Sequence, residues 1–436
     1  MKHNDENPKL WGTPEKISIA VVGSGFGGSL MAMVARRLGF QVTLLERGRH
    51  PRFVIGESTT PLTNLLLEEL SESYDLPALR PLCKWGTWQR QLPHLACGLK
   101  RGFTFYHHEL DGGQEQAPGV ERQLMVGASP RDEVADTHWY RPDFDQYLVG
   151  QAQALGVEYR DQVELNEVEE SDSAMWLRGR RCGARFEMRA DFVIDATGPR
   201  GFLFRGLRLP EKELPGLPPT QALFSHFTDV ETLGETYYGL AGRTPPFPPE
   251  DAAVHHVFPG GWVWMLRFNN GVTSAGLAAT EPLANELELG SGPPAWQRLM
   301  ERLPTLGRLF RHARAVAPFV HQPRLAFQSG ELRGKHWVLL PSAAGVVDPL
   351  LSTGFPLSLL GILRMARALQ LFSKSSLFSE ALDAYVAITR LELETTSRLV
   401  GALYAAMERF DLFKSLIPLY FAAASFSEVA RRLGKP

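Results

Sequence analysis

The chain has 436 residues, of which 44% are hydrophobic and 22% charged, and its formal net charge is −2. This composition is typical of a globular protein with a substantial core, and it excludes a disordered chain or a basic surface for nucleic acid. Three cysteines without a CxxC pair, and a polar N-terminus without a signal-peptide core, favour a cytoplasmic location.

The N-terminal third predicts alternating strands and helices. A β-branched run over residues 17–22 meets glycines, and an apolar helical stretch and a second strand over 41–46 follow. This order predicts a βαβ unit. The segment 140–160 has the apolar spacing of a helix, and short strands follow over 163–195.

The second half of the chain predicts a sheet and then helices. Residues 206–330 combine many prolines with short alternating runs, as expected of an antiparallel sheet that covers a site. Residues 336–365 predict a strand, a loop and a long apolar helix, and the pattern is helical from residue 376 onward. The late run 416–426 is too short to cross a bilayer, so no membrane contact is expected. The order of strands and helices along the chain therefore predicts an α/β fold with more than one lobe.

The glycine-rich turn predicts a dinucleotide site. Gly23, Gly25 and Gly28 form a GxGxxG motif between the first strand and the helix near Phe26, and Glu46 ends the next strand. Glycine permits the tight turn, the approach of a pyrophosphate to the backbone and close helix–strand packing. The helix N-terminus favours phosphate, and the acid can accept hydrogen bonds from a ribose. The alternative is a glycine-rich turn without a ligand.

The other motifs favour FAD over NAD as the dinucleotide. A second GxGxxG does not occur, and the segment 191–201 supplies a strand that ends in Ala196-Thr197-Gly198, with Gly198 as a further cofactor contact. This strand and the segment 336–365 resemble the arrangement in flavoproteins of the p-hydroxybenzoate hydroxylase class. The resemblance implies a Rossmann-type FAD-binding fold with an inserted antiparallel sheet and a C-terminal helical region.

The expected domain boundaries follow from this division of the chain. The FAD-binding domain has two parts, with the inserted substrate-covering sheet between them and a helical region after them. The predicted ranges are 14–205 for the first part, 206–330 for the insert, 331–372 for the completing part and 373–436 for the helices.

Four further segments resemble the flavin-dependent halogenases, especially the branch that acts on free phenols and pyrroles, such as the aminopyrrolnitrin halogenase. They are HPRFVIGESTTP (50–61), GLKRGFTF (98–105), HHVFPGGWVWMLRFNN (255–270) and GVVDPLLSTG (345–354). The likeness runs from residue 17 to about 430, without the C-terminal extension of that relative. The family is typical of secondary metabolism, including antibiotic biosynthesis.

The resemblance implies a two-stage reaction. Reduced FAD (FADH2), delivered by a separate flavin reductase, reacts with O2 to give a C4a-hydroperoxide, and chloride or bromide attacks its distal oxygen. The hypohalous acid then crosses a tunnel to a lysine beside an electron-rich aromatic or similarly nucleophilic carbon. The substrate is a free small molecule or one bound to a carrier protein.

Lys100 matches that lysine, and it is expected to open a strand that runs to Phe105. A primary amine can be halogenated when neutral or can donate a hydrogen bond to hypohalous acid when charged, and burial tunes its pKa. The alternatives are an ordinary solvated lysine at a strand end, or Lys84 in the same role.

The loop before the long apolar helix matches the family's halide and flavin-edge site. The resemblance places the halide at Ser352, Thr353 and Gly354, where backbone N–H groups at a helix N-terminus can hold a small anion. Further flavin contacts by resemblance are listed here: Arg52, Glu57, Ser58, Arg141, Asp348 and Pro349, together with Gly354. Each of these could instead be a surface polar residue or a local turn cap.

Three departures from the family pattern keep other functions open. The signature WxWxIP keeps Trp262 and Trp264 but has Arg267 in place of proline, and that signature is thought to separate halogenases from monooxygenases. Ser342 stands where many flavoproteins have aspartate, and Leu351 stands where tryptophan halogenases have glutamate. The alternatives are an FAD-dependent monooxygenase that hydroxylates its substrate, or a flavin-binding protein without turnover.

The two histidine pairs do not predict a metal site. His107-His108 and His255-His256 are each adjacent on an expected strand, so the side chains of a pair point to opposite faces and cannot share one metal. No metal is therefore expected. His108 or His138 could act as a base near the substrate, but the sequence singles out neither.

Overall fold

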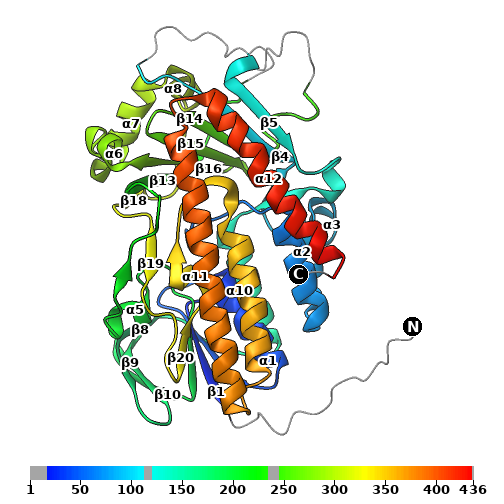
Figure 1. Cartoon of the computed structure of the whole chain (residues 1–436), viewed down its shortest axis with the longest axis vertical. Coiled ribbons are helices and arrows are strands. Elements are labelled where there is room, and N and C mark those ends of the chain that lie inside the picture. The colour runs from blue at the N-terminus through cyan, green and yellow to red at the C-terminus, as the bar shows by residue number, and fades with distance from the viewer. Residues whose placement is uncertain (1–16, 112–119, 234–244, 435–436) are drawn as a thin grey trace.

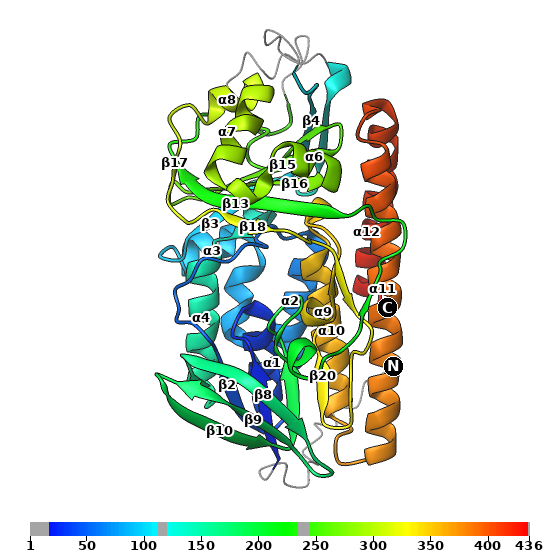
Figure 2. The same ribbon diagram turned by 90° about the vertical axis from the view of Figure 1, so that its left-hand side faces the viewer.

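The computed structural model describes residues 17–111, 120–233 and 245–434. The molecule is elongated, with a parallel sheet at one end, a larger antiparallel sheet at the other and long C-terminal helices along one side (Figures 1 and 2). This is the expected class, an α/β fold with a Rossmann-type domain and a helical C-terminal region.

The parallel sheet contains the predicted βαβ unit. Its strands, in spatial order, are β20 (Trp337–Leu339), β11 (Phe192–Asp195), β1 (Ser18–Val22), β2 (Gln41–Leu45) and β7 (Glu158–Arg160). Helix α1 (Phe26–Arg37) connects β1 to β2. The central strands are almost entirely buried, as the near-continuous apolar runs of a sheet covered on both faces require.

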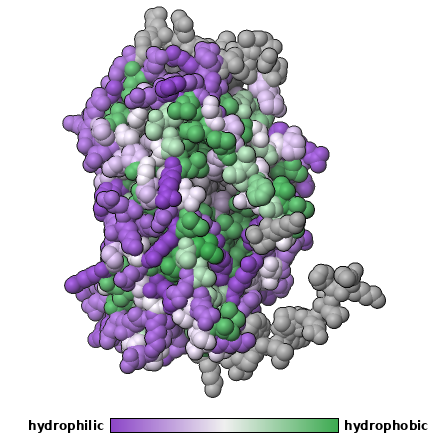
Figure 3. Space-filling model, viewed as in Figure 1, coloured by the Kyte–Doolittle hydropathy of each residue, from purple (hydrophilic) through white to green (hydrophobic). Residues whose placement is uncertain are grey.

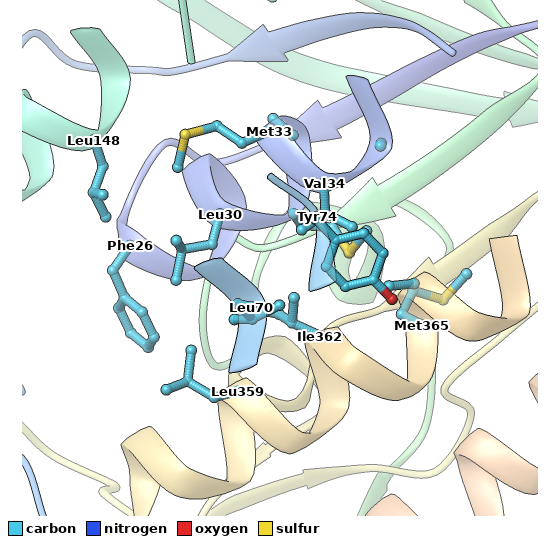
Figure 4. Packing of buried hydrophobic residues seen from close by; sticks show 14 of the residues in the cluster. Phe26, Leu30, Met33, Val34, Leu70, Tyr74, Leu148, Leu359, Ile362 and Met365 are labelled. Carbon is cyan, nitrogen blue, oxygen red and sulfur yellow. The ribbon is translucent and has the colours of Figure 1, made fainter. Parts of the chain in front are cut away.

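One face of this sheet packs against a layer of helices. These are α1, α2 (Pro61–Ser73), α4 (Arg141–Ala154) and α10 (Gly354–Leu369). Apolar residues at helical spacing meet in this layer, with Leu30 from α1, Leu70 from α2 and Ile362 from α10 all fully buried (Figure 4). Smaller elements extend it: η2 (Pro77–Cys83), α3 (Trp85–Gln91) and η4 (Asp132–Val134).

The remaining elements of this end form two small sheets and short helices. One sheet consists of β8 (Val163–Glu170), β9 (Met175–Arg181) and β10 (Ala184–Ala190). The other consists of β12 (Glu211–Lys212), β19 (Phe327–Ser329) and β21 (Gly345–Val346). The short helices are α5 (Phe202–Gly206), α9 (Pro341–Ala344) and η6 (Leu350–Ser352).

The second large sheet is antiparallel except for one pair. Its strands, in spatial order, are β17 (Arg314–Ala315), β13 (Thr220–Thr228), β16 (Thr273–Thr280), β15 (Gly261–Arg267), β14 (Ala253–Phe258), β4 (Gly102–His107) and β5 (Gln123–Gly127), and β18 (Val320–Gln322) also pairs with β13. Strands β14 and β4 are parallel. Thus β4 and β5, which precede the predicted insert at 206–330, also belong to this sheet. The domain boundaries themselves stay predictions.

Short helices cover the far side of this sheet, and a two-stranded ladder joins it to the first domain. The helices are α6 (Glu281–Glu286), η5 (Leu289–Ser291), α7 (Pro293–Arg302) and α8 (Pro304–Leu309), and η3 (Val120–Arg122) precedes β5. The ladder pairs β3 (Cys97–Lys100) with β6 (Asp136–Trp139).

The chain ends in two long helices, α11 (Ser375–Ala405) and α12 (Phe410–Arg432), as the helical pattern after residue 376 predicts. Helix α11 runs beside both large sheets (Figure 2). Large apolar side chains are exposed on α12, including Leu419 and Phe426, and hydrophobic residues gather on the side of the molecule where α12 runs (Figure 3). Within the described ranges, every helix is too short or too polar to span a bilayer.

Candidate active site

A cavity of about 690 Å³ collects residues from both large sheets and from the loops between them. Its volume falls in the range of pockets that bind cofactors and other small molecules. Three loops contribute to the wall: the glycine turn after β1, residues 196–202 after β11, and residues 345–354 before α10. Parallel strands bind ligands at their carboxyl ends, which is where the first two loops lie.

The glycines of the motif have the geometric roles that their spacing predicts. Gly23 has φ +98°, and a Cβ there would lie 2.7 Å from the carbonyl oxygen of Ala196. A Cβ at Gly28 would overlap the carbonyl oxygen of Gly23, so this position sets the close packing of α1 on β1. Both positions therefore exclude a side chain.

The N-terminus of α1 faces two guanidinium groups. A Cβ at Gly25 would lie 3.4 Å from an Arg141 nitrogen and 3.8 Å from an Arg52 nitrogen. Arg141 is buried and forms two 2.8 Å hydrogen bonds to Asp145, one turn further along α4. It also donates to the carbonyl oxygens of residues 55 and 56. The N-terminus of α1, its exposed backbone and the two arginine side chains together suit a pyrophosphate.

Glu46 lies at the end of β2, where the motif predicts a ribose acceptor. Its carboxylate accepts hydrogen bonds from the Ser24 backbone and hydroxyl and from the Gly48 backbone, and Arg52 lies 3.3 Å away. Burial raises the pKa of Glu46, but Arg52 and these donors outweigh it and hold the pKa below its usual value. The side chain is therefore a fixed anion on the cavity wall.

The loop after β11 exposes its backbone to the cavity. Gly198 has φ +84°, and a Cβ there would meet no atom within 4 Å. The buried Asp195 holds the loop, because its carboxylate accepts hydrogen bonds from Thr197 and from the Leu203 backbone. Gly198 and Phe26 both line the cavity.

Asp348 is tied to a helix from the far end of the chain. Its carboxylate accepts hydrogen bonds from the Leu350 backbone at 2.9 Å and from the Tyr404 hydroxyl at 2.9 Å. The Tyr404 oxygen in turn accepts a 3.2 Å hydrogen bond from the indole of Trp262. Burial raises the pKa of Asp348 to about 7, although these donors oppose the shift. Asp348 and Pro349 line the cavity beside this network.

The segment from Leu351 to Gly354 makes a tight turn into α10. Leu351 and Ser352 have φ values of +66° and +57°, which is uncommon for residues with a side chain. The turn brings Ser352, Thr353 and Gly354 to the cavity wall, and a Cβ at Gly354 would meet no atom within 4 Å. Phe355, the next residue of α10, also lines the cavity, and Pro356 after it has no N–H. The backbone donors at the start of α10 therefore come from the residues that line the cavity.

Lys100 is fully buried, so the alternative of a solvated lysine does not apply. Its ammonium nitrogen donates to the Ser58 hydroxyl at 2.8 Å and to the Thr59 carbonyl at 2.5 Å, and it lies 3.8 Å from the centre of the Phe103 ring. Ser58 lines the cavity, whereas Lys100 lies behind it. Lys100 ends β3 and does not open the next strand as expected, because the Arg101 backbone donates out of the ladder to Asp251.

Comparisons with known proteins identify the family. A family model described as FAD dependent oxidoreductase matches residues 18–340. The chain belongs to the FAD-dependent oxidoreductase family. FAD is accordingly its cofactor, and the open backbone at Gly198 and Gly354, the two arginines and Glu46 fit that molecule.

The relatives of this oxidoreductase confirm the resemblance to flavin-dependent halogenases. The chain is 27% identical over 423 residues to tetracycline 7-halogenase of Kitasatospora aureofaciens, and the match covers 93% of this chain and 73% of the relative. It is 28% identical to monodechloroaminopyrrolnitrin halogenase PrnC of Pseudomonas fluorescens, covering 92% and 70%. The crystal structure of halogenase PltM with phloroglucinol and FAD superposes with a TM-score of 0.79 at 25% identity, covering 95% of this chain and 81% of that chain.

Glu57 faces the antiparallel sheet rather than the glycine turn. Its carboxylate lies 2.7 Å from the His226 ring, and both side chains are buried. The Glu57 carbonyl oxygen accepts from the Trp139 backbone at 2.6 Å. Glu57 still lines the cavity of the oxidoreductase, as does Arg52. Its pairing with His226, from a distant strand, fixes the segment that carries Ser58.

The two tryptophans of the altered signature both line the cavity from one face of β15, as their spacing predicts. Arg267 ends the same strand and turns away, since it donates to the carbonyl oxygens of Val230 and Glu231. It thus anchors the chain after β13 instead of entering the cavity. Ser342 lines the cavity at the start of α9, where other flavoproteins carry an aspartate.

The histidine pairs and the rival lysine have structural partners. One histidine of the first pair contacts one histidine of the second pair, because His108 Nε2 and His256 Nδ1 lie 2.9 Å apart. Across the described ranges, no group of three or more potential metal-ligating side chains comes together. Lys84 is 40% exposed and forms an ion pair with Glu68, so it lies outside the buried site.

The sequence missed four residues of the site: Asp145, His226 and Tyr404, which hold it in place, and Asp136, which lies opposite Lys100 in the β3–β6 ladder. Asp145 had a signal, since an aspartate four residues after Arg141 on a helix is placed to pair with it. The others act across large sequence separations, and no local pattern could indicate them.

Proposed function

We propose that this oxidoreductase is a flavin-dependent halogenase that uses reduced FAD, O2 and chloride or bromide to halogenate an electron-rich aromatic or similarly nucleophilic carbon. The observation that carries the proposal is Lys100. Burying a lysine is costly, and the buried Lys100 amine donates a hydrogen bond to Ser58, whose side chain lines the cavity. Such placement favours chemistry at the amine over a structural role.

The proposal divides the reaction between two parts of the site. Bound reduced FAD, with O2, supplies the two-electron oxidation of halide to hypohalous acid. The loop at Ser352, Thr353 and Gly354 supplies the halide position, because the backbone donors at the start of α10 suit a small anion. Ser58 stands between this cavity and the amine of Lys100.

Lys100 then holds the oxidant next to the substrate. In its charged form the ammonium donates a hydrogen bond to the oxygen of hypohalous acid. In its neutral form it reacts with hypohalous acid to give a haloamine and water, and the haloamine transfers the halogen to carbon while the carbon loses a proton. Both routes leave the amine unchanged at the end, so Lys100 acts as a catalyst.

The substrate proposal rests on the apolar side of the cavity. Trp262, Trp264, Phe224 and Leu266 line it, and flat apolar walls favour an aromatic ring. Phloroglucinol, which occupies the PltM structure, is therefore the first substrate to test. Other relatives act on pyrrole carried by a peptidyl-carrier protein, so a carrier-bound substrate is the second. A separate flavin reductase is the proposed electron source, and the free cysteines agree with the proposed cytoplasmic location.

The second candidate function is hydroxylation by an FAD-dependent monooxygenase, which the loss of the signature proline at Arg267 favours. The FAD-loaded protein is reduced without oxygen, mixed with O2 and phloroglucinol, and assayed with and without chloride or bromide. Halogenation predicts a halogenated product only when halide is present. A hydroxylated product that forms equally without halide would establish the monooxygenase.

A Lys100→Ala variant separates the two stages. It should still consume O2 and generate hypohalous acid, which a rapid trap such as a thioether detects, but it should yield no product. Lys84→Ala is the matched control, because this lysine is exposed and paired with Glu68. Full product formation by Lys100→Ala would refute the role of the amine.

A further inference from the structure

Asp136 is the residue directly opposite Lys100 in the β3–β6 ladder. Opposed residues of an antiparallel pair place their side chains on the same face, so the carboxylate and the amine face one buried compartment, where these two described residues act on each other through their charges and not through a direct hydrogen bond. Asp136 is 2% exposed. Asn64 of α2 donates a 2.6 Å hydrogen bond to one carboxylate oxygen, and the other oxygen is buried without a hydrogen-bond partner in the described structure.

Other titratable groups around this compartment do not supply the charge that Lys100 needs. His138 on β6 and His255 on β14 are fully buried, and burial keeps the pKa of each below its usual value, so both are neutral. Glu428 on α12 acts on Asp136 and raises its pKa, in the same direction as burial. Asp136 is therefore the one carboxylate with a direct electrostatic effect on Lys100 among the described residues.

Burial shifts the pKa values of Lys100 and Asp136 toward each other. Burial lowers the pKa of Lys100 and raises the pKa of Asp136, while each charge opposes the shift of the other. A proton that moves from the ammonium to the carboxylate leaves the compartment neutral before and after. The move therefore avoids the large cost of an isolated buried charge, which either group would incur alone.

We propose that Asp136 is a positioning residue that exchanges a proton with Lys100 and so sets whether the amine is charged or neutral. The exchange converts the ammonium and carboxylate into the free amine and the carboxylic acid. This inference rests on the proposed function, because it gives the amine the neutral form that a haloamine requires. After halogen transfer, the carboxylic acid returns the proton to the amine.

The test measures the charge of Lys100 directly. The protein has ten lysines, so ¹⁵N-lysine labelling gives few side-chain signals, and the spectrum of Lys100→Met identifies the one of interest. The isosteric variant Asp136→Asn keeps an oxygen for Asn64 but loses the negative charge. The Lys100 pKa should fall by about 1–3 units, the usual effect of losing an opposite charge nearby.

Two further variants keep the inference testable if Asp136→Asn folds poorly. Asn64→Ala removes the donor to the carboxylate, so Asp136 ionises less readily and the Lys100 pKa should fall by a smaller amount. Glu428→Gln is the matched control, a carboxyl-to-amide change that makes Asp136 easier to ionise. It should not lower the Lys100 pKa. An unchanged pKa in both Asp136→Asn and Asn64→Ala overturns the inference.

The titration also separates this inference from the proposed function. A lowered Lys100 pKa in Asp136→Asn, with no halogenated product from the wild type, supports the proton exchange and refutes the halogenase. If the wild type yields a halogenated product but the Lys100 pKa is unchanged in the variants, the halogenase is supported and the proton exchange is refuted. A shift of the product–pH profile in Asp136→Asn that follows the titration supports both.

Discussion

Replacing Tyr404 by phenylalanine should disconnect α11 from the loop that leads into α10. The hydroxyl is the buried link between the Asp348 carboxylate and the Trp262 indole, at 2.9 and 3.2 Å. Phenylalanine keeps the ring packing, so the change isolates the two hydrogen bonds. A bond to a charged group contributes about 1.5–3 kcal/mol and a neutral one about 0.5–1.5 kcal/mol, so Tyr404→Phe should lose about 2–4.5 kcal/mol of unfolding free energy.

The loss of unfolding free energy in Tyr404→Phe should depend on pH. Burial raises the pKa of Asp348 to about 7. A carboxyl whose folded pKa is raised stabilises the fold fully below its unfolded pKa of about 4, and this stabilisation is lost as pH rises through about 7. The Tyr404 hydroxyl bonds best to the ionised form and so reduces that loss. The difference between Tyr404→Phe and the wild type should therefore be small near pH 4 and grow toward pH 8.

Urea denaturation of the FAD-loaded protein at several pH values measures this difference. Tyr385→Phe is the matched control, since its buried hydroxyl makes a 2.7 Å hydrogen bond to the neutral Leu339 carbonyl. It should lose stability by an amount independent of pH. If Tyr404→Phe also shows a constant loss of the same size, the charged link between α11 and the loop is wrong.

Three other changes test separate parts of the structure. Gly28→Ala should abolish FAD binding, seen as loss of the flavin spectrum after purification, because the new Cβ overlaps the Gly23 carbonyl; retention of flavin would contradict the tight packing. Asp145→Asn should cost about 3–5 kcal/mol in urea denaturation by leaving the Arg141 guanidinium buried without its counter-charge, and a loss below 1 kcal/mol would contradict it. A thiol reagent should label Cys182 alone in the native protein and all three cysteines in denaturant, since burial raises the pKa of the other two; more than one native thiol would refute their burial.

The sequence was most informative where a local pattern has one structural solution. The GxGxxG turn, the acid that ends β2 and the apolar helix at α10 all follow from spacing and residue type, and the structure places them as expected. Lys100 was selected only through resemblance, because a single lysine in a strand-like run has no distinctive pattern. The sequence did not predict that Lys100 is buried; only the structure shows this.

The sequence could not predict contacts that join distant segments. Tyr404 looks like any apolar-face residue of a long helix, yet its hydroxyl reaches Asp348. Asp136 becomes the neighbour of Lys100 only through the β3–β6 ladder, whose strands are too short to predict. The strand assignment of Lys100 failed for a similar reason, because the break at Arg101 depends on a carbonyl from residue 251.

The strand order of the two large sheets has a consequence for synthesis of the protein in the cell. Strand β11 completes its pairing only with β20, and β4 only with β14. As the polypeptide leaves the ribosome, β11 can pair with β1 and β4 with β5, but the second partner of each strand is made much later. The nascent chain thus exposes one unpaired edge on each of these two apolar strands during translation, when aggregation is a hazard. Capture of FAD must follow the emergence of β20 and of the loop at residues 345–354, because that loop completes the cavity wall.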